Sequence, residues 1–506
     1  MNYLAVPSDV DHSFSRSRET LASNNVLGWY LYSFSSEPFI VSAVSTYVPL
    51  LLEQFARING VSLHDHTRKC SPSDDKCVLG LFDNLVFIDT SSFALYTFSL
   101  SVLCQTLTVI SVSGIVDMCN TVKFKSNVLL FFGLLGSVST ILISQLNSSQ
   151  YYSLAFWSIV ANCCYGVVNV VGNSLLPVFV PDMIAHHPAY RNWDVDNLTT
   201  IISGRGSSVG YVSALLVQIF SVVLVKKSRS QDNIQVAVLL VGCWWLLWQM
   251  PMSWLLQDVS LPAATSTQFR WSRSAKYARY GWASLGDALK HASLLKDVVI
   301  FLVGWFIISD SITTINSTAI LFSKTELKMN TVDLIFVSIL TMVNAILGAF
   351  SIPQLLSSRL KQPPQRTLVY IICWASVIPL YGILGFFFSS IGLKHKFEMY
   401  MLAVWYGVAL GGLSAVSRSV FSLIIPRGKE SIFFSLFSVT DKGSSILGPF
   451  LIGLITDKTH NIRYSFYLLF VLLVLSLPVF SALDVARGKR EAQELSELNA
   501  ASQEQS

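Results

Sequence analysis

The feature that most constrains this chain is a series of twelve apolar segments, each long enough to cross a bilayer as a helix. Only 13% of the 506 residues are charged, roughly half the share of a typical soluble domain. A segment inside lipid must satisfy its own backbone hydrogen bonds, which favours helices over open strands. The sequence therefore predicts an all-α polytopic membrane protein. The twelve segments lie near 26–52, 86–116, 127–146, 152–180, 199–225, 235–256, 298–322, 332–356, 367–391, 399–425, 432–456 and 464–484.

The stretch 258–297 is the longest loop between these segments, and it divides them into two sets of six. We expect an N-terminal tail over 1–25, one six-helix bundle over 26–257, a second over 298–485 and a C-terminal tail over 486–506. Lys and Arg are more frequent on the side that carries the two tails and the central loop. The positive-inside rule therefore places both termini and this loop in the cytosol. The C-terminal tail is charged and lacks aromatic residues, which predicts disorder.

Within the central loop, basic residues recur at every third position and alternate with aromatic ones. These basic residues are Arg270, Arg273, Lys276 and Arg279. Basic and aromatic side chains together favour a helix that lies on the membrane surface. The alternative interpretation is a solvated linker.

The two halves of the chain repeat short elements in the same order. The sequence from Gly28 reads GWYLYSFSSEPF and that from Gly304 reads GWFIISDSITTI. Arg205 is followed by Gly-Ser-Ser, and so is Lys442. Such an internal repeat predicts two six-helix bundles of similar plan, as in the Major Facilitator Superfamily. The loop signature of that superfamily is present only in degenerate form, at Gly114, Asp117, Lys123 and Lys125.

A few charged or polar side chains lie inside the apolar segments, where burial of charge is costly and function is the first hypothesis. A basic group in a central cavity can hold a carboxylate, and a partly desolvated acid can carry a proton. The alternative is that these charges pair with one another and lock helices together. The candidates are Glu37, Arg205, Asp310, Asn316, Arg418, Asp441 and Lys442.

Two cysteines, Cys70 and Cys77, lie in a polar loop, where a disulfide, free thiols and a metal site are the alternatives. Asn147 begins a glycosylation sequon in a short loop on the non-cytosolic side, whereas the sequon at Asn197 lies on the cytosolic side. We expect low occupancy at Asn147. No phosphate-binding loop or zinc-protease motif occurs, so we expect no enzyme activity, cofactor or metal. The net charge of +5 has no long block of either sign, which argues against nucleic-acid binding.

Several long runs resemble the fungal autophagy-related vacuolar amino-acid effluxer family of that superfamily. They include GWYLYSFSSEPFIVSAVSTYVPLLL, FIDTSSFALYTFSLSVL, WFIISDSITTINSTAILFSK, GLSAVSRSVFSL and TDKGSSILGPFLIGLITDKTHNIRYSF. The resemblance extends from Leu27 to Glu494. It implies a multi-pass protein of the vacuole membrane that releases leucine, isoleucine, tyrosine and similar amino acids to the cytosol after autophagic degradation.

The resemblance supplies no agreed binding residues. Because the vacuole lumen is acidic, we hypothesise that Glu37 or Asp310 carries a proton while Arg205 or Lys442 holds the substrate carboxylate. The alternatives are a receptor or scaffold for autophagic-body breakdown that moves no solute, and a transporter of another small solute such as a peptide or monocarboxylate. The oligomeric state does not follow from the sequence.

Overall fold

The computed structural model describes residues 8–62, 68–70, 77–81, 85–227, 233–259, 274–290, 295–388, 390–445, 447–459 and 461–504. The first half contains α1 (Ser8–Pro38), the π-helix η1 (Phe39–Tyr47), α2 (Val48–Asn59), β1 (Val61–Ser62), β2 (Cys77–Leu81), β3 (Val86–Asp89), α3 (Thr90–Cys119), α4 (Val122–Ser144), α5 (Tyr151–Asn173), α6 (Leu176–His186), η2 (Pro188–Tyr190), α7 (Val195–Lys227) and α8 (Asn233–Leu255). The second half contains α9 (Ser274–Lys290), α10 (Lys296–Thr325), α11 (Thr331–Ile352), the π-helix η4 (Pro353–Arg359), α12 (Pro364–Leu384), α13 (Lys396–Ile424), α14 (Glu430–Ser444), α15 (Leu447–Thr459), η5 (Ile462–Tyr464), α16 (Ser465–Ser481) and α17 (Val485–Glu504).

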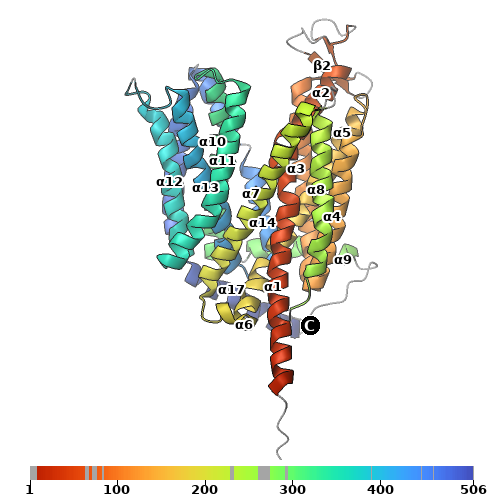
Figure 1. Ribbon diagram of the computed structural model, residues 1–506, viewed down its shortest axis with the longest axis vertical. Helices are drawn as coiled ribbons and strands as arrows, with labels where there is room; N and C mark the ends of the chain where they lie inside the picture. The colour runs from red at the N-terminus through yellow and green to blue at the C-terminus, as the bar shows by residue number, and fades with distance from the viewer. Residues whose placement is uncertain are drawn as a thin grey trace, which may run out of the picture.

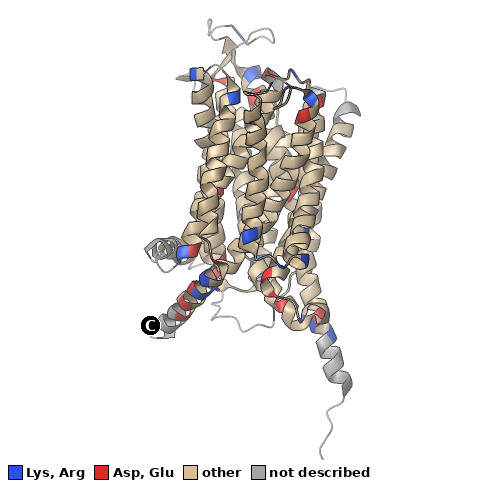
Figure 2. Ribbon diagram, turned by 90° about the vertical axis from the view of Figure 1, so that its left-hand side faces the viewer, with Lys and Arg blue, Asp and Glu red and all other residues tan. Residues whose placement is uncertain are grey.

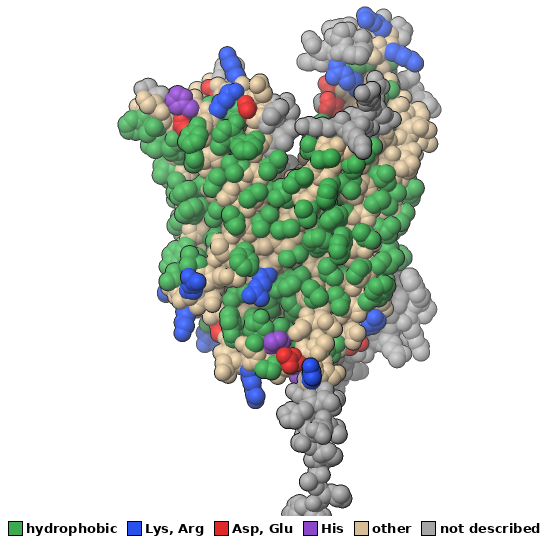
Figure 3. All heavy atoms as spheres, viewed as in Figure 1, with side chains coloured by type: hydrophobic (Ala, Val, Ile, Leu, Met, Phe, Trp, Pro, Cys, Tyr) green, Lys and Arg blue, Asp and Glu red, His purple; other side chains and the backbone are tan. Residues whose placement is uncertain are grey.

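Two helix bundles make up the molecule, as the sequence predicts (Figure 1). Helices α1 to α8 form the first bundle, and α10 to α16 form the second. The bundles part toward the end that carries β2, which we call the sheet end, and meet at the opposite end, which carries α6 and α17 and which we call the tail end. The space-filling view shows the same parting at the sheet end (Figure 3).

The middle of the molecule presents an apolar surface to its surroundings. The described charged residues lie mostly toward the two ends, and hydrophobic side chains cover the helices between them (Figures 2 and 3). Within the described residues, eleven helices or helix runs are long and apolar enough to cross a membrane. The remaining expected segment, the eleventh at 432–456, is divided between α14 and α15, which are too short to span individually. An apolar belt of this height predicts that the bundles sit in a bilayer.

The first span is one continuous helical run from Ser8 to Asn59 rather than a polar tail followed by a helix from residue 26. Its α-helical pattern changes to a π-helix at Phe39, directly after Pro38. Proline has no backbone N–H, so the regular ladder loses a donor at this point and widens. The irregular turn begins next to Glu37, the first of the candidate site residues.

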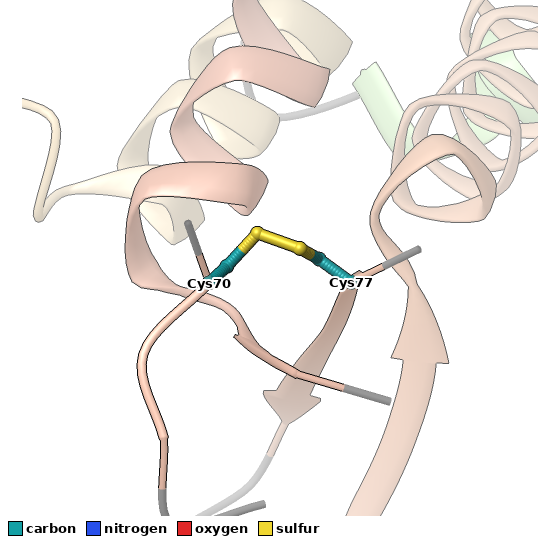
Figure 4. The surroundings of a disulfide bond; sticks show 2 residues. All are labelled: Cys70 and Cys77. Carbon is teal, nitrogen blue, oxygen red and sulfur yellow. A yellow bond between two sulfur atoms is a disulfide. The ribbon is translucent and has the colours of Figure 1, made fainter. Parts of the chain in front are cut away.

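A small three-stranded antiparallel sheet covers the sheet end of the first bundle. The strand order is β1-β2-β3, with Val78 paired to Val61 on one side and to Asp89 on the other. The expected start of the second span at residue 86 is therefore wrong, because residues 86–89 form β3 and α3 begins at Thr90. Cys70 and Cys77 form a disulfide that ties this sheet to the preceding loop (Figure 4).

Two helices outside the spans lie at the tail end. Helix α9 lies against α3, where Gly281 meets the backbone of Gly114 and Trp282 Nε1 donates to Ser111 Oγ at 3.1 Å. The exposed side chains of Lys276 and Trp282 fit the surface-helix interpretation of the central loop. Arg270 and Arg273 lie outside the described residues.

The expectation of a disordered C-terminal tail is wrong, since residues 485–504 form α17. Arg487 pairs with Asp297 at the start of α10, with Nε to Oδ2 at 2.6 Å and Nη2 to Oδ1 at 2.7 Å. Lys489 pairs with Asp196 in the first turn of α7, on the other bundle. The polar composition that suggested disorder thus supplies ion pairs with both bundles.

The helix cap at the start of α11, at the sheet end of the second bundle, gives a first prediction. Asp333 completes a capping box with Asn330 at the start of α11 and accepts from Lys396 Nζ on α13 at 3.1 Å. The Lys396 hydrogen bond, with help from the Asn330 backbone, lowers the pKa of Asp333 below its ordinary value of 3.8. A lowered folded-state pKa stabilises the fold above the ordinary value, and this contribution is lost only as the pH falls through the folded pKa.

We therefore expect the melting temperature of Asp333→Asn to lie below that of the wild type by a constant margin between neutral pH and pH 5. The margin should disappear only below about pH 3.8. Thermal unfolding of the purified protein at several pH values measures it. A margin that already shrinks between pH 7 and pH 5 would contradict the assignment.

The two sequons in loops or at helix starts lie at opposite ends of the first bundle, which gives a second prediction. Exposed Asn147 lies at the sheet end, since Asn59 Nδ2, next to the sheet, donates to the neighbouring Ser148 carbonyl at 2.6 Å. Asn197 lies at the tail end, at the start of α7 beside Asp196. With the sheet end on the non-cytosolic side, any glycan of the native protein should be lost in Asn147→Gln and kept in Asn197→Gln. Electrophoretic mobility before and after glycosidase treatment tests this, and a glycan that depends on Asn197 would reverse the orientation.

Candidate functional site between the two bundles

The tail end is closed by a layer of hydrogen bonds between the bundles, mainly along α7. Three of them are Thr200 Oγ1 to Ser419 Oγ at 2.8 Å, Ser203 Oγ to the Ala415 carbonyl at 2.7 Å and Ser208 Oγ to the Ile346 carbonyl at 3.1 Å. Small side chains allow this approach, because a Cβ at Gly204 would lie 2.4 Å from the Ala349 carbonyl oxygen of α11. The layer separates the open side of the molecule from the tail end.

A second contact at the tail end joins the C-terminal end of α3 to the first turn of α14. Buried Asp117 accepts from the backbone N–H of Ser431 at 3.0 Å and of Ile432 at 2.9 Å. The first turn of a helix has unpaired N–H groups and a partial positive charge, so a carboxylate from the other bundle satisfies both. The degenerate loop signature that contains Asp117 was the sequence signal for this contact. Lys125 and Glu430, both buried, pair beside it at 3.7 Å.

Glu37 of α1 lies toward the sheet end of this layer, against α7. It packs over Gly210 of α7, where a Cβ would lie 3.2 Å from Glu37 Cγ. Among the described residues its carboxylate makes no hydrogen bond and no ion pair within 4.0 Å, and the residue is only partly buried. The positive charges that act on it come from the second bundle, from Arg418 of α13 and Lys442 of α14.

Arg418 reaches from the second bundle toward the first. Its Nη2 donates to Ser207 Oγ of α7 at 3.2 Å, and its guanidinium carbon lies 5.6 Å from the centre of the Trp29 ring on α1. A cation over an indole ring is attracted by the electron density of its face. The other terminal nitrogen, Nη1, is buried and has no hydrogen-bond partner. Arg418 therefore keeps an unused donor at the contact between the bundles.

A chain of polar side chains connects α1 with α5 beside these charges. The Tyr32 hydroxyl donates to Asn173 Oδ1 at 2.6 Å, and Asn173 Nδ2 donates to Asn169 Oδ1 at 3.0 Å. Asn169 Nδ2 in turn donates to the Tyr165 hydroxyl at 3.3 Å. Sequence reasoning did not select the two tyrosines, although the four-residue spacing of Tyr165, Asn169 and Asn173 places them on one helix face.

The other candidates have partners of their own. Arg205 lies beside Tyr30 and interacts with it electrostatically. Asp441 pairs with its neighbour Lys442 at 3.7 Å and also accepts from Ser309 Oγ at 2.6 Å. The Asp441–Lys442 contact matches the alternative of internal pairing, whereas Glu37 and Arg418 form no ion pair within the described residues.

Asp310 and Asn316 lie on α10 in different settings. Buried Asp310 accepts from the Gly448 backbone N–H at 2.8 Å and so caps the start of α15, where the eleventh segment is interrupted. The side chain of Asn316 is exposed. The structure therefore brings Glu37, Arg418 and Lys442 together electrostatically, and it places Asp310 at a helix junction within the second bundle.

Comparison with known proteins places most of the chain in one family. A model of the family described as "Vacuole effluxer Atg22 like" matches residues 22–493. The protein named autophagy-related protein 22 from Eremothecium gossypii is 64% identical over 99% of this chain and 98% of its own length. Its namesake from Kluyveromyces lactis is 65% identical over 98% and 100%, and that from Saccharomyces cerevisiae S288c is 61% identical over 97% of each.

Solved structures resemble the fold at low sequence identity. A bacterial homologue of the iron transporter ferroportin, in an outward-facing state, aligns with a TM-score of 0.62 and 14% identity over 91% of this chain and 98% of that chain. The major facilitator superfamily proton:xylose symporter XylE aligns with a TM-score of 0.60 and 11% identity over 93% and 96%. At these identities the likeness concerns the fold alone, which is all-α and like that of the Major Facilitator Superfamily.

Proposed function

The chain belongs to the Atg22-like vacuole effluxer family, and from this premise we propose that it releases amino acids from the vacuole to the cytosol by alternating access. The observation that carries the proposal is the pair of opposite charges, Glu37 and Arg418, that the two bundles contribute above a layer closed on one side only. A site shared between two bundles can be exposed to either side when the bundles rock.

We assign the sheet end to the vacuole lumen and the tail end to the cytosol. The excess of Lys and Arg on the tail-end side supports this orientation, and so does a disulfide at the sheet end, because disulfides persist outside the reducing cytosol. In this orientation the closed layer faces the cytosol, and the conformation described is open to the lumen. The protein is a multi-pass component of the vacuole membrane with both termini in the cytosol.

We further propose that a proton leaves the lumen with the amino acid and that Asp310 carries it. Asp310 joins α10 to the start of α15, so a change in its charge alters a contact between two elements of the second bundle. A proton that neutralises this carboxylate weakens its attraction for the helix terminus. Glu37 is then available for the substrate, and the two ligands use separate groups.

The test is uptake of radiolabelled leucine by liposomes that contain the purified protein, with and without an imposed pH gradient. We expect uptake that depends on the protein, saturates with leucine and is faster when protons move in the same direction. Absence of transport for leucine, peptides and monocarboxylates alike would favour the receptor or scaffold. Transport of another solute, without transport of leucine or tyrosine, would show that the protein is a transporter with a different substrate. Co-localisation of a tagged protein with a vacuole-membrane dye tests the location.

A further inference from the structure

Arg418 has more hydrogen-bond capacity than the protein uses. A guanidinium carries five N–H donors in a planar fork that fits a carboxylate. Ser207 takes one donor at 3.2 Å, while buried Nη1 has no partner among the described residues. Buried polar groups are nearly always paired, so an orphaned donor in the space between the bundles indicates an acceptor that arrives from outside the chain.

Glu37 is the complementary group on the first bundle. Its carboxylate likewise has no hydrogen bond or ion pair in the described part of the chain, and Arg418 exerts the largest charge effect on it. The two side chains are near enough to interact through space and are not within the 4.0 Å of an ion pair. This leaves an acceptor group on the first bundle and a donor group on the second without a direct contact between them.

Three tyrosines surround both charges. Tyr32, Tyr165 and Tyr211 each interact electrostatically with Glu37 and with Arg418. The hydroxyls of Tyr32 and Tyr165 are already engaged in the asparagine chain, and Tyr211 lies beside Ser414. Aromatic side chains therefore lie near both charges, together with Lys442, which also acts on Glu37.

We propose that Arg418 and Glu37 together bind the charged backbone of a zwitterionic α-amino acid, with the carboxylate on Arg418 and the ammonium on Glu37. This inference rests on the proposed transport of amino acids and identifies the groups that recognise the substrate. The sequence suggested Arg205 and Lys442 for the carboxylate. Lys442 pairs with Asp441 instead, and Arg205 lies beside Tyr30.

Binding in this way links the substrate to the closed layer. Arg418 contacts Ser207 of α7, which also lies 3.3 Å from Ser414 of α13 between hydroxyl oxygens. A substrate carboxylate that binds the Arg418 guanidinium competes with Ser207 for the N–H donors of Arg418. The substrate would thus join the bundles at the level of Glu37 while it withdraws one contact that keeps the tail end closed.

The experiment measures binding of labelled leucine to the purified full-length protein and its competition by two analogues. Leucinamide lacks the carboxylate, and 4-methylpentanoate lacks the ammonium. We expect each analogue to compete about tenfold or more weakly than leucine with the wild type, because each leaves one buried charge unpaired. An analogue that competes as well as leucine would overturn the assignment of the corresponding group without the use of any variant.

Two variants then match each analogue to one residue. Arg418→Gln should weaken the binding of leucine about tenfold or more and leave the already weak binding of leucinamide unchanged. Glu37→Gln should weaken the binding of leucine by a similar factor and leave the binding of 4-methylpentanoate unchanged. The matched control is Arg205→Gln, which removes an intramembrane arginine that lies beside Tyr30. This variant should change the binding of neither leucine nor the analogues.

A purely structural role gives a different result. If Arg418 only holds the bundles together, Arg418→Gln should weaken the binding of leucine and that of leucinamide by the same factor. That outcome would overturn the proposal. Gel filtration monitors folding, and Arg418→Lys, which keeps the charge and loses the fork, replaces a variant that does not fold. A wild type that neither binds nor transports any amino acid refutes the proposed function. Saturable leucine transport without the analogue pattern refutes only this site.

Discussion

Asp117→Ala is expected to open the tail end of the molecule. The variant removes both bonds to the first turn of α14, at 3.0 and 2.9 Å, and leaves two N–H groups of that helix without a partner. Loss of such a cap costs about 1–2 kcal/mol, which shifts the balance between closed and open forms by roughly 5- to 30-fold. Because the contact joins the two bundles, the cost falls on the closed form.

The measurement is the rate at which a membrane-impermeant maleimide labels Thr200→Cys from the tail end. Thr200 is buried in the closed layer, and the six free cysteines are first replaced so that only the new thiol reacts. We expect labelling to become faster in Asp117→Ala. Asp333→Ala is the matched control, because Asp333 also caps a helix but joins only elements of its own bundle. Equal labelling rates in the wild type and Asp117→Ala would show that Asp117 does not hold the layer closed.

Asp310→Asn is expected to separate transport from the pH gradient. Asparagine keeps an acceptor oxygen for the Gly448 N–H, so the cap of α15 remains, and it cannot exchange a proton. Leucine uptake by liposomes should continue, and the stimulation by an imposed pH gradient should be lost. Asp310→Ala removes the cap as well and should cost about 1–2 kcal/mol of stability, seen as a lower melting temperature.

The pair of variants distinguishes the proton from the cap. Asp310→Asn with normal stability and normal gradient stimulation would assign the proton to another group, with Glu37→Gln as the next variant to examine. Loss of all uptake in Asp310→Asn, with an unchanged melting temperature, would place Asp310 in substrate binding instead. Gradient stimulation that persists in both variants would exclude Asp310 from coupling.

The spans were predictable because they depend on local composition. A run of apolar residues must enter the bilayer whatever follows it, so eleven of the twelve expected segments match spans within the described residues. The errors lie where local composition is a poor guide. Residues 86–89 are apolar but pair with β2, and the polar tail is helical because Arg487 and Lys489 find acidic partners on distant helices.

The sequence predicted which residues are candidates for the site, but not which partners each of them contacts. Hydropathy alone placed Glu37, Arg205, Asp310, Arg418, Asp441 and Lys442 inside the apolar segments. Nothing local distinguishes Arg205 from Arg418, since both lie among serines and glycines on long apolar helices. The structure separates them, because one meets Tyr30 and the other meets Trp29 and Ser207.

The sequence by itself determined that this protein is a membrane bundle, which charges it buries and which family it resembles. Those properties follow from the cost of transferring each side chain or peptide group into lipid, which is set residue by residue. Only the tertiary structure decided which charges remain without partners, where the bundles touch and which end is closed. These properties depend on contacts such as Asp117 with Ile432, whose partners are far apart in the chain and meet only when the two bundles pack.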